Sequence, residues 1–496
     1  MEIQELYSKI QAGEDVRANL IALRRELKEE EKQRALAYLM GGEFEVFIRL
    51  LDSSDPKVRK NAALILGEME TEDVLPSLFH AYEKEETLFV RSDFLKAIAR
   101  LDYTPCLPRL KERLGQLRAA IPEAENRKHL REEQLALQEM ILRYEKPKPH
   151  RFTGYDPAPE VILLTNRSQR ETVKAMILEG SVTELPAGLR IRNGNLRDLM
   201  KIRVFNEMLF PIPGAVPLSG TPEQIGEALA GLRIPDYLDR LHEKGEAYYY
   251  RMDIRGPLPL EKKGPLIRRI AEVLDGRSGG KLCNTPSGYE VELRLLERRD
   301  GSFLPMLRLH TLPDRRFAYR KETVAASIAP VNAALAVELA RPYLRENGQV
   351  LDPFCGVGTM LTERAKALPA HDLYGVDIYR DAIEKARRNA ENAGCVIHYI
   401  NRDYFDFTHS YLFDEIITDM PRSQGEEAKE ESRKLYGRFF EKSLTHLKDG
   451  GMMVLYTMEP ELAEAAAAGR PEYELLEEFL LNEKNDTRVM VFRIKK

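Results

Sequence analysis

The spacing of apolar and polar positions changes along the chain and divides it into regions. Up to about residue 143, apolar residues recur at the interval of amphipathic helices. The segment KPKPHRFTGYDPAPE (146–160) is rich in proline and polar residues and is typical of a linker. Strand-like and helix-like segments then alternate. The pattern predicts a helical domain over 1–145, a linker over 146–160, an α+β module over 161–310 and an α/β domain over 311–496.

The helical region contains an internal repeat. LPSLFHAY (75–82) returns as LPRLKERL (107–114), and VRKNAALIL (58–66) returns as VRSDFLKAI (90–98), both with the same 32-residue offset. Paired helices repeated at this length resemble HEAT-type units, which stack because one pair cannot bury its apolar face alone. We expect a small HEAT-like domain, and the sequence leaves open whether it binds a protein or RNA partner or only packs on its neighbour.

The middle region mixes strands and helices without a fixed period. Strands are predicted at 161–166, 247–256 and 289–297, and helices at 170–178 and 265–276, with mixed character over 196–212. This order is typical of an α+β module.

From residue 349 the strand–helix alternation becomes regular. Strands QVLD, LYGVDI, VIHYINRD, DEIITD, GGMMVLYT and TRVMVFRI are separated by helical patterns, the last two of them near 430–448 and 472–480. The pattern predicts a doubly wound, mainly parallel sheet. Ligands of such sheets bind at the carboxyl ends of the strands, where the chemistry is to be sought.

Four successive strands of this domain end in aspartate, at positions 352, 377, 403 and 419. Carboxylates gathered at one sheet edge repel one another, and a ligand with hydrogen-bond donors relieves that repulsion. The first strand runs into DPFCGVGT (352–359), where Gly356 and Gly358 permit a tight turn and Thr359 opens the next helix. A glycine turn alone also fits a dinucleotide site, but this one lacks the GxGxxG spacing.

Composition narrows the classes of protein. A length of 496 residues suggests about three domains, and 43% hydrophobic residues support folded cores. The net charge of −5 confines any nucleic-acid binding to a local patch. The four scattered cysteines form neither a disulfide framework nor a metal-binding spacing. The first residues, polar and acidic, do not form a signal peptide, and no apolar run approaches a membrane span, so we expect a cytoplasmic protein with no membrane contact and no metal.

The region 311–496 resembles the S-adenosylmethionine-dependent RNA guanine-N2 methyltransferases, whose first motif reads DPFCGSGT. Val357 replaces the commoner serine. The resemblance implies that S-adenosylmethionine is the cofactor. It assigns the methionine end of the cofactor to Asp352, Pro353, Phe354, Cys355, Gly356, Gly358 and Thr359, the ribose to Asp377 and Ile378, and the adenine to Asp403 and Tyr404.

The same resemblance places the catalytic corner at TDMPR (418–422), with Asp419, Pro421 and Arg422 at the reacting amine. In the usual corner two prolines and an aromatic residue follow the acid. Here Met420 replaces the first proline and Arg422 the aromatic residue, although a guanidinium plane can also stack on a base. Three hypotheses about the function stay open. The protein is an RNA base-amine methyltransferase, a catalytically altered RNA-binding or scaffold protein, or a methyltransferase for protein side-chain nitrogens.

The middle region resembles a ferredoxin-like domain followed by a THUMP domain, a module associated with tRNA. Between residues 250 and 322 there are 16 Lys and Arg against 10 Asp and Glu. Such a patch suits phosphate binding, although a solvated basic face has the same composition. We expect tRNA or rRNA to contact the following residues: Lys262, Lys263, Arg268, Arg269, Arg316 and Arg320.

Overall fold

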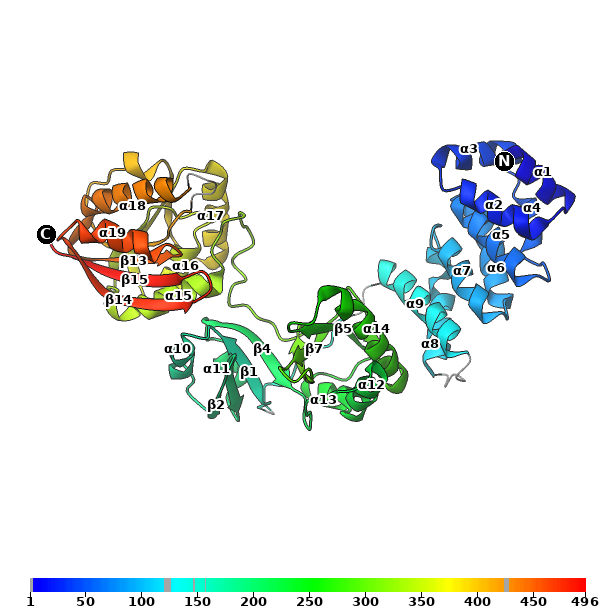
Figure 1. The fold of residues 1–496 in the computed structure, drawn as a ribbon, viewed down its shortest axis with the longest axis horizontal. Coiled ribbons are helices and arrows are strands. Elements are labelled where there is room, and N and C mark those ends of the chain that lie inside the picture. Colours follow the sequence, from blue (N-terminus) through cyan, green and yellow to red (C-terminus); the bar gives the residue numbers. More distant parts are fainter. Residues whose placement is uncertain (1–2, 120–125, 146–147, 157, 423–427) are drawn as a thin grey trace.

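The computed structural model arranges the chain as three successive parts. Figure 1 shows them as the blue-to-cyan helices, the green module and the yellow-to-red domain. The model describes residues 3–119, 126–145, 148–156, 158–422 and 428–496. The predicted sequence of a helical part followed by a C-terminal α/β domain is confirmed.

The N-terminal part is built from helices that repeat as the sequence predicts. Asp55 caps α5 by accepting from the Lys57 N–H at 2.8 Å. The short 3₁₀ turns before α6 and α8, Glu72–Val74 and Thr104–Cys106, also fall 32 residues apart. A Cβ on Gly67 of α5 would lie 2.6 Å from the backbone of α7, so the two helices pack at close range. The helices are α1 Ile3–Ala12, α2 Val16–Glu26, α3 Glu30–Met40, α4 Glu45–Leu50, α5 Pro56–Glu68, α6 Leu75–Lys84, α7 Leu88–Ile98, α8 Leu107–Ala119 and α9 Arg127–Tyr144.

The central module carries an eight-stranded sheet in the order β2-β3-β1-β4-β8-β7-β5-β6. Its strands are β1 Val161–Thr165, β2 Ser181–Leu185, β3 Gly188–Arg192, β4 Phe205–Pro211, β5 Tyr248–Arg255, β6 Leu282–Asn284, β7 Val291–Glu297 and β8 Phe303–Leu309. Its helices are α10 Arg170–Ala175, α11 Leu196–Leu199, α12 Pro222–Gly231, α13 Ile234–Leu241 and α14 Leu260–Arg277. The pairing of β4 with β8 joins the two halves into one sheet.

The stretch expected to be a linker is packed where the structure describes it near residue 150. The His150 Nδ1 lies 2.8 Å from a Glu290 carboxylate oxygen, and the His150 ring stacks on Tyr248. Phe152 is buried and forms an isolated β-bridge with His242. These partners lie far away in the sequence, which is why composition alone suggested a free linker.

The C-terminal domain is a seven-stranded sheet in the order β11-β10-β9-β12-β13-β15-β14. Strands β9 to β13 run parallel, and β15 is antiparallel to both of its neighbours. The strands are β9 Gly348–Asp352, β10 Ala370–Asp377, β11 His398–Asn401, β12 Phe413–Asp419, β13 Leu447–Thr457, β14 Tyr473–Asn482 and β15 Thr487–Ile494. The helices are α15 Pro330–Ala340, α16 Thr359–Ala367, α17 Arg380–Ala393, α18 Ala428–Leu444 and α19 Pro460–Ala468.

The helix predicted near 472–480 is wrong, because this stretch forms strand β14. Its glutamates gave the segment a helical pattern of charge. In the sheet, Glu474 pairs with Arg493 and Glu478 with Arg488, both on the adjacent strand β15. Cross-strand ion pairs of this kind exist only after the two strands meet.

Polar contacts hold the central module against the C-terminal domain. Arg203 makes a bidentate pair with the buried Glu363 of α16, at 2.7 and 2.8 Å, and the Tyr319 hydroxyl donates to the same carboxylate at 2.6 Å. Asn166 and Gln169 donate to backbone carbonyls at the end of β14, at 2.9 and 3.0 Å. Among the described helices, none combines the length and apolar character that a membrane crossing requires.

Candidate active site at the carboxyl edge of the C-terminal sheet

The sheet topology brings the four strand-end aspartates together. Asp352, Asp377 and Asp419 close β9, β10 and β12, and Asp403 follows β11. Because these strands are consecutive and parallel in the sheet, their carboxyl ends form one edge. The chain order reverses between β9 and β12, which is the place where ligands of doubly wound sheets bind. The predicted row of acids therefore exists as a spatial row.

The glycine turn after β9 has the backbone that its sequence predicts. Gly356 and Gly358 have φ of +52° and +78°, values that side-chain-bearing residues rarely adopt. A Cβ on Gly358 would lie 2.1 Å from the Tyr399 hydroxyl, so this glycine is also required by packing. A Cβ on Gly356 would meet no atom within 4 Å, so the loop borders open space on that side.

The start of α16 faces the same turn. Thr359 opens the helix after Gly358, as predicted, and its buried hydroxyl oxygen has no hydrogen-bond partner among the described residues. The first turn of a helix presents free N–H groups that favour an anion. The turn and the helix start together fit the carboxylate of an amino-acid-bearing ligand.

Asp352 is buried at the base of the turn. One of its carboxylate oxygens accepts from the Thr418 hydroxyl at 2.6 Å and from the Phe354 N–H at 3.1 Å. Burial, together with the charges of Asp377 and Asp419, raises the pKa of Asp352 to about 8. Asp352 therefore ties β9 to β12 and shapes the loop. Its neighbour Cys355 is also buried, as a small packing residue.

Asp377 has the geometry of a hydroxyl-binding carboxylate. Its two oxygens accept from the Gly356 and Tyr379 N–H groups, each at 2.8 Å, and this fixes the orientation of the side chain. Each oxygen keeps a lone pair for a further donor. Ile378 is 60% exposed and Tyr379 73% exposed directly beside it, which leaves an uncovered apolar surface at this edge. These residues fit a nucleoside: hydroxyls on the carboxylate and a flat ring on the apolar surface.

Asp403 and Tyr404 separate in the structure. Asp403 is half-buried and accepts from the Phe405 N–H at 2.9 Å. Tyr404 is 2% exposed, and its hydroxyl lies within hydrogen-bonding distance of Ser443 and His446. The Tyr404 side chain is therefore part of the core, because it packs between the sheet and α18 instead of facing the edge. The Tyr404 side chain is thus not available to a ligand at this edge, and the contact of Asp403 with the adenine stays a prediction.

Asp419 differs from the other acids in having no hydrogen-bond donor. None of the described side chains or N–H groups donates to its carboxylate. Burial raises the pKa of Asp419 to about 7, and the charge of Arg422 opposes that rise. An unpartnered carboxylate at the end of a central strand can accept from a ligand amine.

The residues after Asp419 show what the altered motif does to the backbone. The Met420 N–H donates to the Tyr456 carbonyl at 3.0 Å, which extends the pairing of β12 with β13 by one hydrogen bond. A proline at this position has no N–H and would lose that bond. The Met420 side chain is buried, Pro421 is half-buried, and Arg422 is exposed with no ion pair to a described residue. The guanidinium of Arg422 is thus available to a substrate.

Sequence reasoning missed two residues beside Asp419. Tyr456 is the register partner of Asp419 on β13, and Asn332 of α15 donates to the Tyr456 hydroxyl at 3.5 Å. The sequence did offer the tyrosine next to the end of GGMMVLYT, since that strand also ends at this edge. No sequence pattern pointed to Asn332, because α15 and β13 are far apart in the chain and come into contact only in the folded structure.

The predicted RNA-contacting residues divide by exposure. Arg316 is 7% exposed, bonded to Asp314 and to the Phe205 carbonyl, so we correct its assignment to RNA: it stabilises the fold. Arg320 is half-buried, its Nε has no partner among the described atoms, and burial lowers its pKa. Arg269 is exposed but pairs with Glu223 at 2.5 Å. The positions that stay exposed without an acidic partner in the described chain are Lys262 and Arg268, and the half-buried Lys263 donates to the Gly256 carbonyl.

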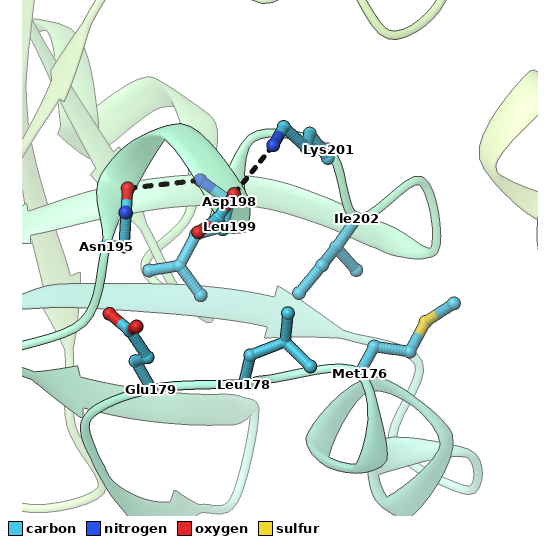
Figure 2. A pocket seen from close by; sticks show the side chains of 8 residues that line it. All are labelled: Met176, Leu178, Glu179, Asn195, Asp198, Leu199, Lys201 and Ile202. Atoms are coloured by element: carbon cyan, nitrogen blue, oxygen red, sulfur yellow. Dashed lines mark hydrogen bonds and ion pairs between the residues drawn. The ribbon is translucent and has the colours of Figure 1, made fainter.

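A separate cavity of about 250 Å³ lies in the central module, between the end of α10 and α11. Figure 2 shows its apolar side chains, among them Met176, Leu178 and Ile202, beside the ion pair of Asp198 with Lys201. Its lining has one aspartate, which is paired with Lys201, and no row of acids like the one at the sheet edge. The chemistry of the molecule is therefore sought at the edge.

Family comparisons agree with this location. Residues 319–486 match the family model of the RMKL-like methyltransferase domain, and residues 44–121 match HEAT repeats. One relative is the tRNA (guanine(10)-N2)-dimethyltransferase of Methanothermobacter thermautotrophicus, 31% identical over 131 residues, which are 26% of this chain and 38% of the relative. Another is the tRNA (guanine(6)-N2)-methyltransferase of Thermus thermophilus, 31% identical over 207 residues, which are 40% of this chain and 58% of the relative.

Solved structures share the fold over a longer span. TrmN from Thermus thermophilus superposes with a TM-score of 0.51 at 22% identity and covers 68% of this chain and 99% of its own. SMU.472, described as a methyltransferase complexed with SAH, gives a TM-score of 0.50 at 14% identity and covers 68% and 97%. A span of 68% exceeds the C-terminal domain, so the shared fold extends beyond that domain.

Proposed function

Taking residues 319–486 as a methyltransferase domain whose cofactor is S-adenosylmethionine, we propose that the protein methylates a base amine of structured RNA. The proposed acceptor is guanine N2 in tRNA or rRNA. The observation that carries this proposal is the Asp419 carboxylate at the end of β12: no residue that the structure describes donates to it, and it lies next to a turn and an acid row that fit the cofactor. Both relatives described above are, by name, guanine-N2 methyltransferases of tRNA.

Different residues at the sheet edge would bind different parts of the cofactor. Gly356, Gly358 and the start of α16 would hold its methionine end, Asp377 its ribose hydroxyls, and Asp403 its adenine. The bound cofactor supplies an electrophilic methyl group on a positively charged sulfur. Asp352, buried behind the turn, acts on this site only by fixing the backbone.

Asp419 would orient and activate the acceptor. A guanine amine is a weak nucleophile, because its lone pair is delocalised into the ring. When the Asp419 carboxylate accepts one amine hydrogen, it turns the nitrogen and returns electron density to it. As the new N–C bond forms, the amine loses one proton, and a carboxylate with a pKa of about 7 can take that proton.

The central module would bind the body of the RNA. Lys262 and Arg268 of α14 are exposed on a module that Arg203 fixes to the catalytic domain through Glu363. We propose that this surface is a THUMP-like phosphate-binding surface. Reversing Lys262 and Arg268 to glutamate should raise KM for RNA and reduce the salt dependence of binding, with kcat nearly unchanged.

The decisive experiment measures transfer of labelled methyl groups to total tRNA, total rRNA and total protein, followed by mass spectrometry of the digested nucleosides. We expect methylguanosine in RNA from the wild type and none from Asp419→Asn. An Asp406→Asn variant, changed at an exposed aspartate near the same edge, serves as the matched control. Binding of cofactor and RNA without turnover would instead identify a scaffold protein, and methylated protein would identify a side-chain methyltransferase.

A further inference from the structure

Tyr456, the register partner of Asp419, has a hydroxyl proton that no described residue accepts. Tyr456 is 6% exposed, and its oxygen accepts from the Asn332 amide at 3.5 Å. A phenol oxygen that accepts from an amide turns its own proton away from that amide. Among the described residues, none accepts the Tyr456 proton.

The strand pairing places Tyr456 and Asp419 next to each other in the sheet. Asp419 and Tyr456 are register partners on the parallel strands β12 and β13. Partners on neighbouring strands are separated by roughly 5 Å, and their side chains leave the same face of the sheet. The charges of Asp419 and Arg422 both act on the pKa of Tyr456, which burial and Asp419 raise to about 12. A phenol with this pKa stays protonated at ordinary pH, so its hydroxyl can donate to an acceptor on a ligand.

The site therefore presents an acceptor and a donor side by side. Asp419 accepts, and Tyr456 donates. Next to the amine of guanine, the ring carries one hydrogen-bond acceptor, the nitrogen N3. A base that offers an amine hydrogen and a neighbouring ring nitrogen matches this pair of groups.

We propose that Tyr456 positions the target base by donating its hydroxyl proton to the ring nitrogen N3 next to the guanine amine, and that Asn332 orients this hydroxyl. The assignment rests on the proposed function. Tyr456 is a positioning residue: it forms no bond with the reacting methyl group. Its effect is to hold the amine in line while Asp419 accepts a hydrogen from the same amine.

The test combines a protein variant with an altered base. Tyr456→Phe removes only the hydroxyl, and tRNA carrying 3-deazaguanosine at the methylated position removes only the ring nitrogen. On unmodified tRNA we expect Tyr456→Phe to lower kcat/KM about tenfold, the effect of one lost hydrogen bond in a desolvated site. The wild type should lose a similar factor on the 3-deazaguanosine tRNA, and Tyr456→Phe should lose nothing further there. Cofactor affinity should be the same in both proteins.

Tyr436→Phe is the matched control. The hydroxyl of Tyr436 is also buried, but it pairs with Thr457 at 2.5 Å in a core on the other face of the sheet. Any loss in Tyr436→Phe should be equal on both RNAs. Equal loss on both RNAs for Tyr456→Phe would show a merely structural role and overturn the proposal. A wild-type protein that methylates no guanine would overturn the proposed function itself. If guanine is methylated but the effects of Tyr456→Phe and of 3-deazaguanosine simply add, only the role of Tyr456 is overturned.

Discussion

Replacing Asp419 with asparagine should abolish turnover and, at neutral pH, stabilise the fold. Burial holds the pKa of Asp419 at about 7, against 3.8 for an ordinary aspartate. Because the folded pKa is raised, folding takes up a proton between these two values, and stability falls as pH rises from about 4 to 7. Three pKa units correspond to about 4 kcal/mol at pH 8. Asparagine carries no charge, so this cost disappears in the variant.

The expected gain in the free energy of unfolding is smaller than the roughly 4 kcal/mol that the full pKa shift would give. Asp419 is only half-buried, so solvent reaches part of its carboxylate, and asparagine finds no new partner there. We expect Asp419→Asn to raise the free energy of unfolding by about 1–3 kcal/mol at pH 8 and by almost nothing at pH 4. Calorimetry and urea unfolding followed by circular dichroism, each in a pH series without cofactor, measure this difference. The chain has no tryptophan to serve as a fluorescence probe.

Two results would refute this reasoning. A loss of stability at pH 8 would mean that the carboxylate has a partner in solution. A gain independent of pH would mean that charge is not the cause. Asp406→Asn, at an exposed aspartate, should show no such pH dependence. A variant that is more stable yet inactive is the pattern expected of a strained functional group.

Three further predictions concern the same domain. Gly358→Ala should lower cofactor affinity at least tenfold and the Tm by several degrees, since its Cβ would lie 2.1 Å from a tyrosine hydroxyl at a φ of +78°, whereas Gly437→Ala, in open space on α18, should fold normally. Arg364→Met should cost about 3–5 kcal/mol, because the fully buried Glu415 carboxylate loses its cationic partner and keeps only the Arg345 N–H. Denaturant titration measures this cost, and a second change, Glu415→Leu, should restore most of the lost stability. The rate of methyl transfer should rise with pH through about 7, as Asp419 loses its proton, and a flat pH profile of kcat/KM would contradict this.

The HEAT-like repeat shows that the local sequence pattern was enough to predict the helices of the N-terminal part. The 32-residue offset predicted matching helices, and the structure adds matching 3₁₀ turns before α6 and α8. The glycine turn could also be predicted locally, since the two glycines permit its positive φ values and the threonine that follows opens the helix.

Strand β14 shows where local pattern fails. Its alternation of glutamate and apolar residues suits a helix as well as a strand, and the arginines that decide the matter belong to β15. Arg316 and Tyr404 were misplaced for a related reason. A basic or aromatic residue looks available in a sequence, and only the packed structure shows that Phe205 or Ser443 already engages it.

The sequence by itself determined the order of the domains, the turn at 352–359 and the aspartates that end four strands, because each depends on residues close together in the chain. The tertiary structure decided which of those aspartates lacks a partner and which residues stand beside it. Asp352 accepts from Thr418, whereas Asp419, to which no described residue donates, lies next to Tyr456 on the neighbouring strand. Such differences arise only when strands and helices distant in sequence meet and bury their charges.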